Sequence, residues 1–241
     1  GRAVDKKRII AVDIGNTSVL FAEVVGGKIG KSLRIKTQGA VAVAVVRELK
    51  KHFDLKRVEA IVIASVVPAL GKSLRWILPH KLGVKTLLIG KELEVPIRNR
   101  YRNPKQVGVD RLVNSYAAYR AHPGPVVIID FGTAITFDAI SAKGEYLGGV
   151  IAPGIEISLE ALFERTALLP RTTLRHVEQT VIGRDTAESI RIGCSTGIGG
   201  LCDRMIERIS QKLGCKVLVI ATGGYARFMR RYCRSIDRVD L

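Results

Sequence analysis

Two short polar stretches, each directly after an apolar segment, carry the residue types that bind phosphate and cations. The first is Asp13-Ile14-Gly15-Asn16-Thr17. It suits a hairpin turn, because Gly and Asn tolerate positive φ. It equally suits a phosphate-binding loop, in which Gly15 lets the backbone approach a ligand, Asn16 and Thr17 donate hydrogen bonds, and Asp13 holds a metal or a water. One such loop does not decide between the two interpretations.

The second polar stretch is Asp130-Phe131-Gly132-Thr133, with the same order of aspartate, glycine and small hydroxyl residue. Asp130 and Gly132 have the same spacing as Asp13 and Gly15. The chain therefore resembles two similar halves, each of which begins with a copy of the same loop. A repeated loop is better explained by a shared ligand than by two unrelated turns. ATP with its cations needs donors for the phosphates and carboxylates for the metal. The pair therefore predicts a polyphosphate site.

A third candidate site is Gly108-Val109-Asp110-Arg111, where a carboxylate and a guanidinium stand side by side as a helix begins. One interpretation is structural, with Asp110 as the N-cap and Arg111 solvated. The other is chemical, because such a carboxylate can accept the proton of a substrate hydroxyl and the arginine can pair with a substrate carboxylate. The residues alone leave both interpretations open.

These candidates lie at the ends of predicted strands and helices, which follow from period-2 and period-3.6 apolar patterns. In the first half we expect strands at 8–15, 19–25, 32–37, 58–67 and 85–89 and helices at 42–53 and 70–82. After a helix at 109–121 we expect strands at 126–131, 134–140, 146–151 and 216–222 and helices at 155–169, 185–213 and 225–233.

The order of these elements predicts an α/β protein with two similar βββαβαβ domains of the actin-like, ribonuclease H-like kind, flanking an ATP cleft. The run His122-Pro123-Gly124-Pro125 breaks the chain between them. The expected domains are therefore residues 1–123 and 124–241.

The composition excludes several classes of protein. A hydrophobic content of 47% over 241 residues excludes a disordered chain. No apolar run reaches the roughly 18 residues of a membrane span, and residues 1–10 lack the apolar segment of a secretory signal, so we expect a cytoplasmic protein without a membrane partner. The four cysteines form no C-x-x-C pair and the four histidines no H-x-x-x-H pair, which argues against a zinc site or a dithiol redox site.

The net charge of +17 and a pI near 10.1 indicate an anionic partner. Lysines and arginines cluster at 97–105 and 227–238 but also occur throughout both halves. Nucleic acid would suit this charge, and so would a small anionic substrate drawn in by a positive field. Because charged runs are usually solvated surface, nucleic-acid binding is not the favoured role.

Seven motifs occur in the order and approximate spacing of type III pantothenate kinases. They are DIGNT (13–17), ASVVP (64–68), YRNPKQVGVDR (101–111), DFGTAITFD (130–138), YLGGVIAPG (146–154), TALLP (166–170) and GRDT (183–186). The chain closely resembles this family over about residues 8–230. The resemblance implies ATP-dependent phosphorylation of pantothenate to 4'-phosphopantothenate, the first step of coenzyme A biosynthesis.

The resemblance also implies a role for each matching residue. The first ATP-phosphate loop comprises Asp13, Ile14, Gly15, Asn16, Thr17, Ser18, Val19 and Leu20. The pantothenate pocket comprises Tyr101, Gly108, Val109, Asp110, Arg111 and Thr186. Within it, Asp110 resembles the general base and Arg111 the partner of the substrate carboxylate. Asp130 resembles the ligand of a monovalent cation, potassium or ammonium, and Thr133 an ATP contact. The implied cofactors are ATP, Mg²⁺ and that cation.

The family supplies Thr186 from the neighbouring subunit, so the resemblance implies a homodimer with shared active sites. Plainer interpretations stay open for three residues: Tyr101 as a half-buried aromatic residue, Thr133 as a turn residue, and Thr186 as the first residue of a helix capped by Asp185. The small residues of 193–200 would allow close helix packing at a dimer interface.

The chain departs from the family pattern at two places. IRIGCSTGIGGLCDRM (190–205) departs from the more aromatic helix expected there, and the sequence stops at SIDRVDL (235–241), where the family usually continues into a final strand. The alternative function is a catalytically weak relative acting as an accessory transcriptional regulator or nucleic-acid-binding protein. A pure binding protein has no chemical reason to keep Asp13, Asp110, Arg111 and Asp130 together.

Overall fold

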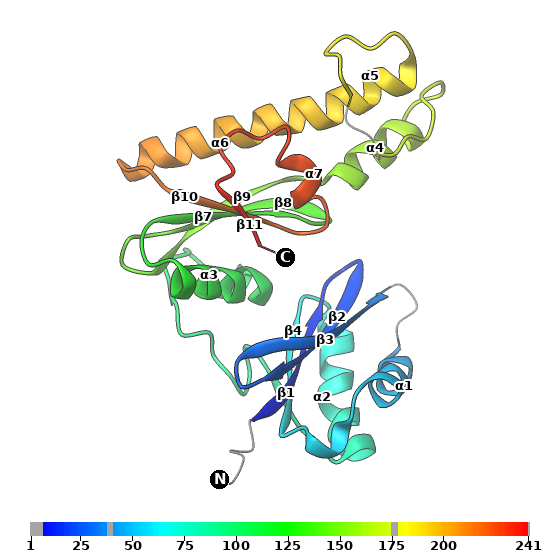
Figure 1. The fold of residues 1–241 in the computed structure, drawn as a ribbon, viewed down its shortest axis with the longest axis vertical. Coiled ribbons are helices and arrows are strands. Elements are labelled where there is room, and N and C mark those ends of the chain that lie inside the picture. The colour runs from blue at the N-terminus through cyan, green and yellow to red at the C-terminus, as the bar shows by residue number, and fades with distance from the viewer. Residues whose placement is uncertain (1–6, 38–40, 175–177, 241) are drawn as a thin grey trace. The chain divides into compact units, whose positions relative to one another are not determined.

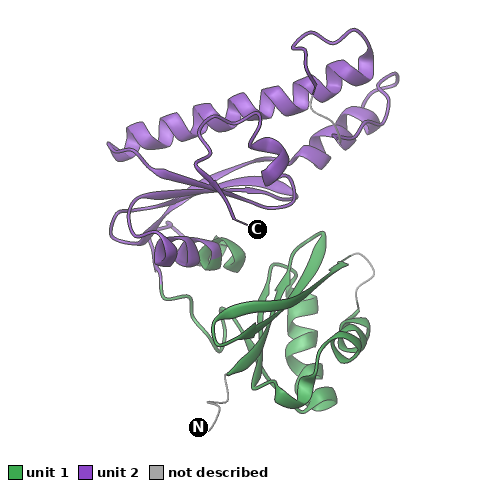
Figure 2. Cartoon of the chain, viewed as in Figure 1, with its two compact units in different colours: residues 1–96, 105–113 green, residues 97–104, 114–241 purple. Residues whose placement is uncertain are grey.

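The computed structural model describes residues 7–37, 41–174 and 178–240, which form two compact units (Figure 2). Unit 1 comprises residues 1–96 and 105–113, and unit 2 comprises residues 97–104 and 114–241. This division differs from the expected boundary at residue 123, because the segment that links the two halves contributes to both units. Ala118 and Tyr119 of helix α3 (Val109–Ala121) pack on buried strand residues of unit 2.

Unit 1 is built on a five-stranded sheet in the order β3-β2-β1-β4-β5 (Figure 1). The strands are β1 (Arg8–Ile14), β2 (Ser18–Val25), β3 (Lys28–Lys36), β4 (Ala60–Ser65) and β5 (Lys85–Leu88). The first three form an antiparallel meander, and β4 and β5 extend the sheet in parallel beside β1. Helix α1 (Ala42–His52) precedes β4, and helix α2 (Pro68–Leu82) lies between β4 and β5.

The apolar patterns of unit 1 explain this arrangement. Alternation along β1 buries Ile10, Val12 and Ile14 on one face of the sheet. Helices α1 and α2 place apolar residues at three- and four-residue spacing against the same core. Pro68 begins α2 and Gly83, at φ 66, ends it, so proline and glycine occupy the helix ends that suit them.

Unit 2 repeats the topology of unit 1, with the sheet order β11-β10-β7-β8-β9-β6. The strands are β6 (Arg98–Asn99), β7 (Val126–Phe131), β8 (Ala134–Ile140), β9 (Glu145–Pro153), β10 (Leu218–Thr222) and β11 (Arg238–Val239). Strands β7, β8 and β9 form an antiparallel meander, and β10 and β11 are parallel to β7. The predicted pair of βββαβαβ units is therefore confirmed, with β6 added at one edge of the second sheet.

The helices of unit 2 are α4 (Ile155–Glu164), α5 (Thr186–Ile192), α6 (Ile198–Leu213) and α7 (Ala226–Met229). A π-helical turn over Gly193–Gly197 joins α5 to α6, so the two appear as one long helix in Figure 1. Gly199 packs on the backbone of Tyr232 within the same unit, because an added Cβ would overlap the Tyr232 carbonyl. The structure thus gives one of the small residues of 193–200 a packing role inside the chain.

Two predicted helices are too long. Helix 155–169 ends at Glu164, since the Thr166 hydroxyl donates to the Leu162 carbonyl that a continuing helix would use. Helix 225–233 shortens to Ala226–Met229, and the Asp203 carboxylate accepts the N–H groups of Arg234 and Ser235 just beyond it. The sequence analysis gave no residue range for the last strand of the second βββαβαβ domain; β11 takes that place and pairs in parallel with β10.

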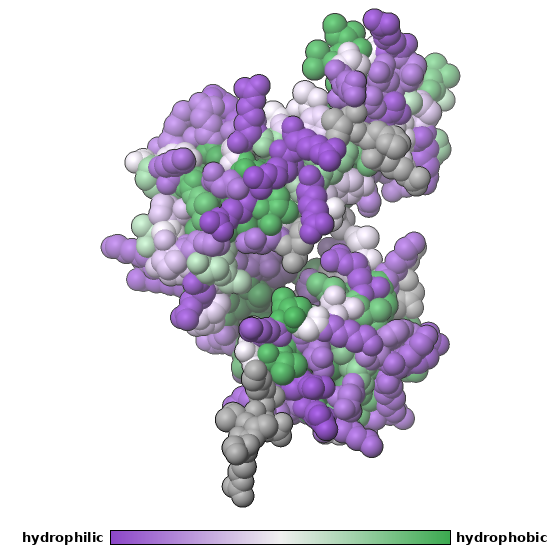
Figure 3. All heavy atoms as spheres, in the orientation of Figure 1, coloured by the Kyte–Doolittle hydropathy of each residue, from purple (hydrophilic) through white to green (hydrophobic). Residues whose placement is uncertain are grey.

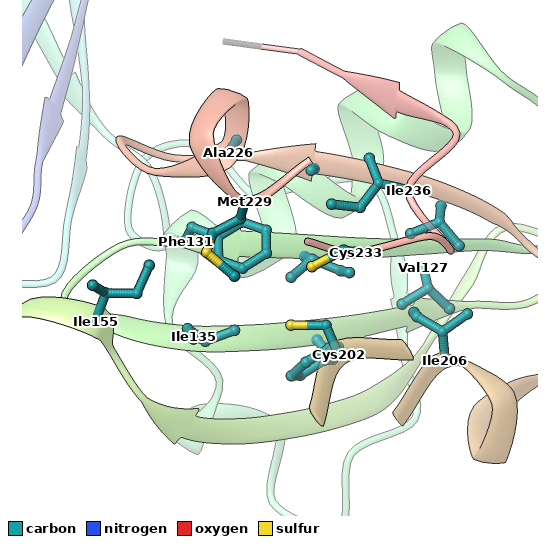
Figure 4. Close-up of a cluster of buried hydrophobic side chains, with 14 of the residues drawn as sticks. Val127, Phe131, Ile135, Ile155, Cys202, Ile206, Ala226, Met229, Cys233 and Ile236 are labelled. Atoms are coloured by element: carbon teal, nitrogen blue, oxygen red, sulfur yellow. The ribbon is translucent and has the colours of Figure 1, made fainter. Parts of the chain in front are cut away.

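The core of unit 2 contains Cys202 of α6 and Cys233 of the C-terminal segment, whose side chains lie among Phe131, Ile135 and Met229 (Figure 4). Cys194, Cys202, Cys215 and Cys233 are all free thiols. A hydrogen bond with Cys202 and burial raise the pKa of Cys233, which disfavours its thiolate form. Among the residues that the structure describes, no helix is both long and apolar enough to cross a bilayer.

Candidate active site

The first candidate loop is the connection between β1 and β2, and the end of β3 holds it in place. The Gly15 N–H donates to the Ser18 carbonyl at 2.9 Å and closes the turn. Thr37, just after β3, donates from its hydroxyl to the Gly15 carbonyl at 2.8 Å and from its N–H to the Thr17 carbonyl at 2.9 Å. The loop is thus a hairpin turn with a fixed backbone, and Asn16 and Thr17 are exposed on it. A fixed backbone also suits phosphate binding. The structure is therefore compatible with both interpretations of this stretch, as a hairpin turn and as a phosphate-binding loop.

Asp13 occupies the mouth of this hairpin, where it pairs with Leu20 across the sheet and with Ala64 of β4. The residue is exposed by its surface area, yet the protein atoms crowded around its carboxyl group restrict hydration and raise its pKa. The negative charge of Asp110 raises the pKa further, whereas the Arg34 guanidinium lowers it. Two carboxylates and one guanidinium therefore interact within unit 1.

Arg34 is a candidate site residue that the sequence motifs did not indicate. It lies on β3 opposite Leu20 of β2, and its Nη1 donates to the Ser18 hydroxyl at 3.3 Å. Only strand pairing could have revealed Arg34, because the β2–β3 register brings this residue, three positions before Thr37, beside a loop that is far from it in sequence. An exposed guanidinium here offers a positive charge beside the loop.

The carboxylate of Asp110 lies in the first turn of α3, which begins at Val109, and not at the N-cap position. Its Oδ1 accepts the N–H of Arg111 at 2.8 Å. A Cβ on Gly108 would overlap this oxygen, so the glycine is required for the position of the carboxylate. The Gly108-to-Arg111 stretch and the Asp13 loop both belong to unit 1, as their electrostatic coupling requires.

The second candidate loop, between β7 and β8, is one residue shorter than the first, with residues 132–133 in place of 15–17. The Gly132 N–H donates to the Ala134 carbonyl at 3.1 Å. Asp130 occupies the position on β7 that Asp13 occupies on β1, and it pairs with Thr136 and with Thr222 of β10.

Two glycines outside this second loop pack against it. A Cβ on Gly154 would overlap the Thr133 carbonyl, and a Cβ on Gly223 would overlap Oδ1 of Asp130 and the backbone of Phe131. Gly223 also has φ +90, which favours glycine. The sequence analysis did not assign either glycine to the site. In both cases the sequence offered one indication of the role, which is a glycine directly after the last residue of a strand.

Tyr101 and Thr186 belong to unit 2, together with Asp130 and Thr133. Tyr101 is half-buried beside Tyr146, and its N–H donates to the Asn99 side chain at 2.9 Å. Thr186 is exposed and is the first residue of α5. Asp185 caps this helix by accepting the Glu188 N–H at 2.8 Å. The interpretation of Thr186 as the first residue of a helix capped by Asp185 is therefore confirmed.

Few side chains of the types that bind metal ions lie near Asp13 and Asp130 in the part of the chain that the structure describes. Within residues 7–37, 41–174 and 178–240, no group of three or more His, Cys, Asp or Glu side chains is arranged to hold a metal ion. Asp13 and Asp130 each stand as a single carboxylate at the mouth of a hairpin. A cation at either carboxylate would need further oxygen ligands from backbone, water or a bound phosphate.

Two repeated βββαβαβ units, each with an aspartate at the mouth of its first hairpin, define the two-domain fold of actin-like ATPases and sugar kinases. One structure with this likeness is the Lmo2764 protein of Listeria monocytogenes, a proposed N-acetylmannosamine kinase, with a TM-score of 0.53 and 12% identity over 97% of this chain and 92% of that chain. Another is a proposed Baf-family transcriptional activator of Campylobacter jejuni, with a TM-score of 0.60 and 20% identity over 96% and 90%. At these identities the likeness shows the fold alone.

The sequence comparisons narrow this class to one family. Residues 9–208 match the type III pantothenate kinase family. The type III pantothenate kinase of Moorella thermoacetica is 39% identical over 96% of this chain and 93% of its own length. That of Desulforapulum autotrophicum is 41% identical over 96% and 91%. The chain therefore belongs to the type III pantothenate kinase family.

Proposed function

We propose that this chain transfers the γ-phosphoryl group of ATP to the terminal hydroxyl of pantothenate, giving 4'-phosphopantothenate in the first step of coenzyme A biosynthesis. The observation that carries the proposal is the coupling of Asp13 and Asp110 within one unit, in a chain that belongs to this kinase family. Phosphoryl transfer to an alcohol needs a base for the alcohol and compensation for the phosphate charge. The two carboxylates and Arg34 supply groups of these kinds.

In this proposal Asp110 accepts the proton of the pantothenate hydroxyl as the oxygen attacks the phosphoryl group. Gly108 leaves room for the carboxylate, and the bond from the Arg111 N–H holds Oδ1 in one orientation. The Arg111 guanidinium pairs with the carboxylate of pantothenate, which fixes the opposite end of the substrate. By resemblance to the family, Val109 and Tyr101 are also assigned to pantothenate.

The ATP phosphates bind the loop from Asp13 to Leu20 in the same proposal, with Thr133 as a further contact. Mg²⁺, when bound with ATP, would neutralise phosphate charge beside Asp13. The raised pKa of Asp13 supports this role, because a crowded carboxylate next to a second carboxylate is stabilised by an added cation.

Asp130 is proposed to bind a monovalent cation, potassium or ammonium. Support comes from the glycines around it: Gly132 and Gly223 leave the space beside Oδ1 without a Cβ, so backbone and carboxylate oxygens come close together there. Phosphoryl-transfer rates should then be higher in potassium or ammonium than in sodium at matched ionic strength. Equal rates in all three salts would remove this site from the proposal.

A homodimer with shared active sites is the proposed assembly, with Thr186 reaching the partner's pantothenate pocket. The segment before α5 exposes large apolar side chains, with Leu168 91%, Val181 76% and Ile182 76% exposed. Figure 3 shows hydrophobic surface over the connection between α4 and α5. Exposed apolar surface of this kind often marks a protein interface. Gly193, Gly197 and Gly200 have open space beside them, which would admit close packing of a partner helix.

The alternative of a regulator or nucleic-acid-binding protein is not favoured, since the chain belongs to a kinase family. Exposed arginines do gather at Arg227, Arg230, Arg231, Arg234 and Arg238. ATP and pantothenate are themselves anions, so positive charge is also compatible with the kinase. We place the activity in the cytoplasm, where ATP is available.

The decisive experiment is an ADP-release assay with Mg²⁺, potassium and millimolar ATP. Pantothenate should stimulate ADP release, whereas glucose, acetate and glycerol should not. None of these three compounds carries both a carboxylate and a primary hydroxyl. The absence of turnover with pantothenate would end the kinase proposal.

A further inference from the structure

Strand β9 holds the segment that carries Tyr101, and the proposed reaction does not use the side chains involved. Residues 97–104 belong to unit 2, whereas residues 105–113, which follow directly, belong to unit 1. Strand β6, within this segment, has two residues and pairs with the edge of β9. The Arg100 N–H extends the pairing by donating to the Tyr146 carbonyl at 2.8 Å. So short a strand is a weak anchor by its backbone alone.

On one face of β9, Glu145 anchors the segment by charge. Its Oε1 accepts bonds from Nη2 of Arg100 at 2.7 Å and from Nε at 3.1 Å, and Nη1 of Arg98 lies 3.5 Å away. The Glu145 side chain is 18% exposed, so this pair is better shielded from solvent than an ordinary surface ion pair. Two bonds from one guanidinium fix direction as well as distance.

On the other face of β9, Tyr146 is fully buried at 0% exposure. Its ring centroid lies 6.4 Å from that of Tyr101, with 42° between the ring planes. Its hydroxyl donates to Oδ1 of Asp138 at 2.8 Å. The ring of Tyr101 also lies over Gly148, 3.5 Å from the position that a Cβ would take. Tyr146 therefore forms one wall beside the ring of Tyr101.

The buried carboxylate of Asp138 is the unusual part of this arrangement. Asp138 is 1% exposed, and Thr136 donates to its Oδ2 at 3.3 Å. Burying a carboxylate costs free energy unless hydrogen bonds compensate, and an apolar residue would avoid that cost. What the carboxylate provides is an acceptor that orients the Tyr146 hydroxyl, and through it the ring beside Tyr101.

We propose that Asp138, Glu145 and Tyr146 are positioning residues that fix the ring of Tyr101 for pantothenate. The proposal rests on the proposed function, in which Tyr101 contacts pantothenate. Glu145 holds the backbone from one face of β9, and Asp138 with Tyr146 holds the ring from the other. Loss of either anchor leaves the catalytic groups in place and weakens pantothenate binding.

The buried anchor is tested with Tyr146→Phe, which removes one hydroxyl and keeps the ring. The KM for pantothenate should rise about 3- to 10-fold, as expected for one hydrogen bond. The kcat and the KM for ATP should stay within about twofold of wild type, since the ATP loops are untouched. Asp138→Asn should raise the pantothenate KM less than Asp138→Leu does, because the amide oxygen still accepts the Tyr146 hydroxyl. Tyr119→Phe is the matched control, since its hydroxyl bonds to the Ala142 carbonyl in the turn before β9 and not to Asp138.

The exposed anchor is tested with Arg100→Met, which keeps the chain length and removes the bonds to Glu145. The pantothenate KM should again rise with little change in the ATP KM. Arg204→Met breaks an exposed pair with Glu207 on α6 and should change neither constant. If Tyr146→Phe does not fold, Arg100→Met still decides the proposal.

A second readout follows the ring itself and needs no substrate. With 3-fluorotyrosine in place of tyrosine, the ¹⁹F resonance of Tyr101 is assigned by its loss in Tyr101→Phe. That resonance should shift or broaden in Tyr146→Phe and in Arg100→Met, and stay unchanged in both controls. An unchanged resonance in both variants, or a pantothenate KM within about twofold of wild type in both, would overturn the proposal. Wild-type protein that gives no turnover with pantothenate would instead reject the proposed function, and the ¹⁹F result would still decide the positioning role.

Discussion

The charge of Asp110 raises the pKa of Asp13, although the two residues lie at opposite ends of unit 1 in sequence. The path of the chain brings them together. Residues 97–104, which include β6, belong to unit 2, and the chain then returns to unit 1 with residues 105–113. The proposed function makes Asp110 the general base and the loop that follows Asp13 a phosphate-binding loop, which is the arrangement that phosphoryl transfer to an alcohol needs.

Asp110→Asn should lower kcat by about 10²- to 10⁴-fold, because it removes the base and keeps the size of the side chain. Pantothenate affinity, measured by calorimetry, should change little, since Arg111 remains. Arg111→Ala should show the opposite pattern, with weaker pantothenate binding as its main effect. If Asp110→Asn kept more than about half of the wild-type kcat, Asp110 would not be the base.

Asp13→Asn should stabilise unit 1 at neutral pH while it reduces turnover. The pKa of Asp13 is raised above its ordinary value of 3.8, so the folded state holds this proton more tightly than the unfolded state. Well below pH 3.8 the group is protonated in both states and costs nothing. As the pH rises through the raised pKa, the ionised carboxylate becomes a cost to folding that the variant avoids.

The measurement for Asp13→Asn is the urea midpoint at several pH values, followed by the fluorescence of Trp76, which is the only tryptophan and lies on α2 of unit 1. The gain in midpoint over wild type should be small near pH 4 and larger near pH 7. Glu59→Gln, an exposed change in the same unit, should show no such trend. A gain that is independent of pH would contradict the assigned cause.

Much of this arrangement was predictable from the sequence, and the reasons differ by element. Strand β1 was predicted from the alternation of its buried residues and β7 from a short continuous apolar run, and both are local patterns. The repeated loops were predicted because two copies of Asp-x-Gly are more specific than one. The position of Arg34 beside Ser18 was not predicted, because it depends on the register between β2 and β3, and the apolar pattern of a single strand does not show which residues face each other.

The short elements were the ones that sequence patterns could not give. Strands β6 and β11 have two residues each, too few for any periodicity. Gly154 and Gly223 were overlooked because their importance comes from close approach to Thr133 and Asp130, not from their own loops. The division of residues 97–113 between two units likewise depends on tertiary contacts.

Gly154→Ala should impair ATP binding, because the added methyl group would displace the backbone of Thr133 and Gly132. We expect the KM for ATP to rise by about tenfold or more, with the overall fold retained, since a shift of that loop misplaces its donors. Gly224→Ala is the control, because a Cβ there meets no atom within 4 Å. ATP kinetics that are the same for both variants would place the second loop outside the ATP site.

The proposed shared-site dimer gives a prediction for mixtures of two impaired variants. If Thr186 serves the partner's pocket, each site takes Asp110 from one subunit and Thr186 from the other. Co-expressing Asp110→Asn with Thr186→Ala then yields mixed dimers in which one site carries both changes and the other carries neither. Activity should rise above that of either variant, toward half of the wild-type rate per mixed dimer.

Two differently tagged chains allow the mixed dimers to be purified, so that subunit mixing is measured directly and not assumed. Each variant must first be clearly impaired alone. The matched control pairs Asp110→Asn with Arg111→Ala: both residues are adjacent on α3 and serve one subunit's site, so every site in that mixture carries one change and activity should not recover. If the Thr186→Ala mixture is no more active than the mean of its parents, Thr186 does not act across the subunit interface.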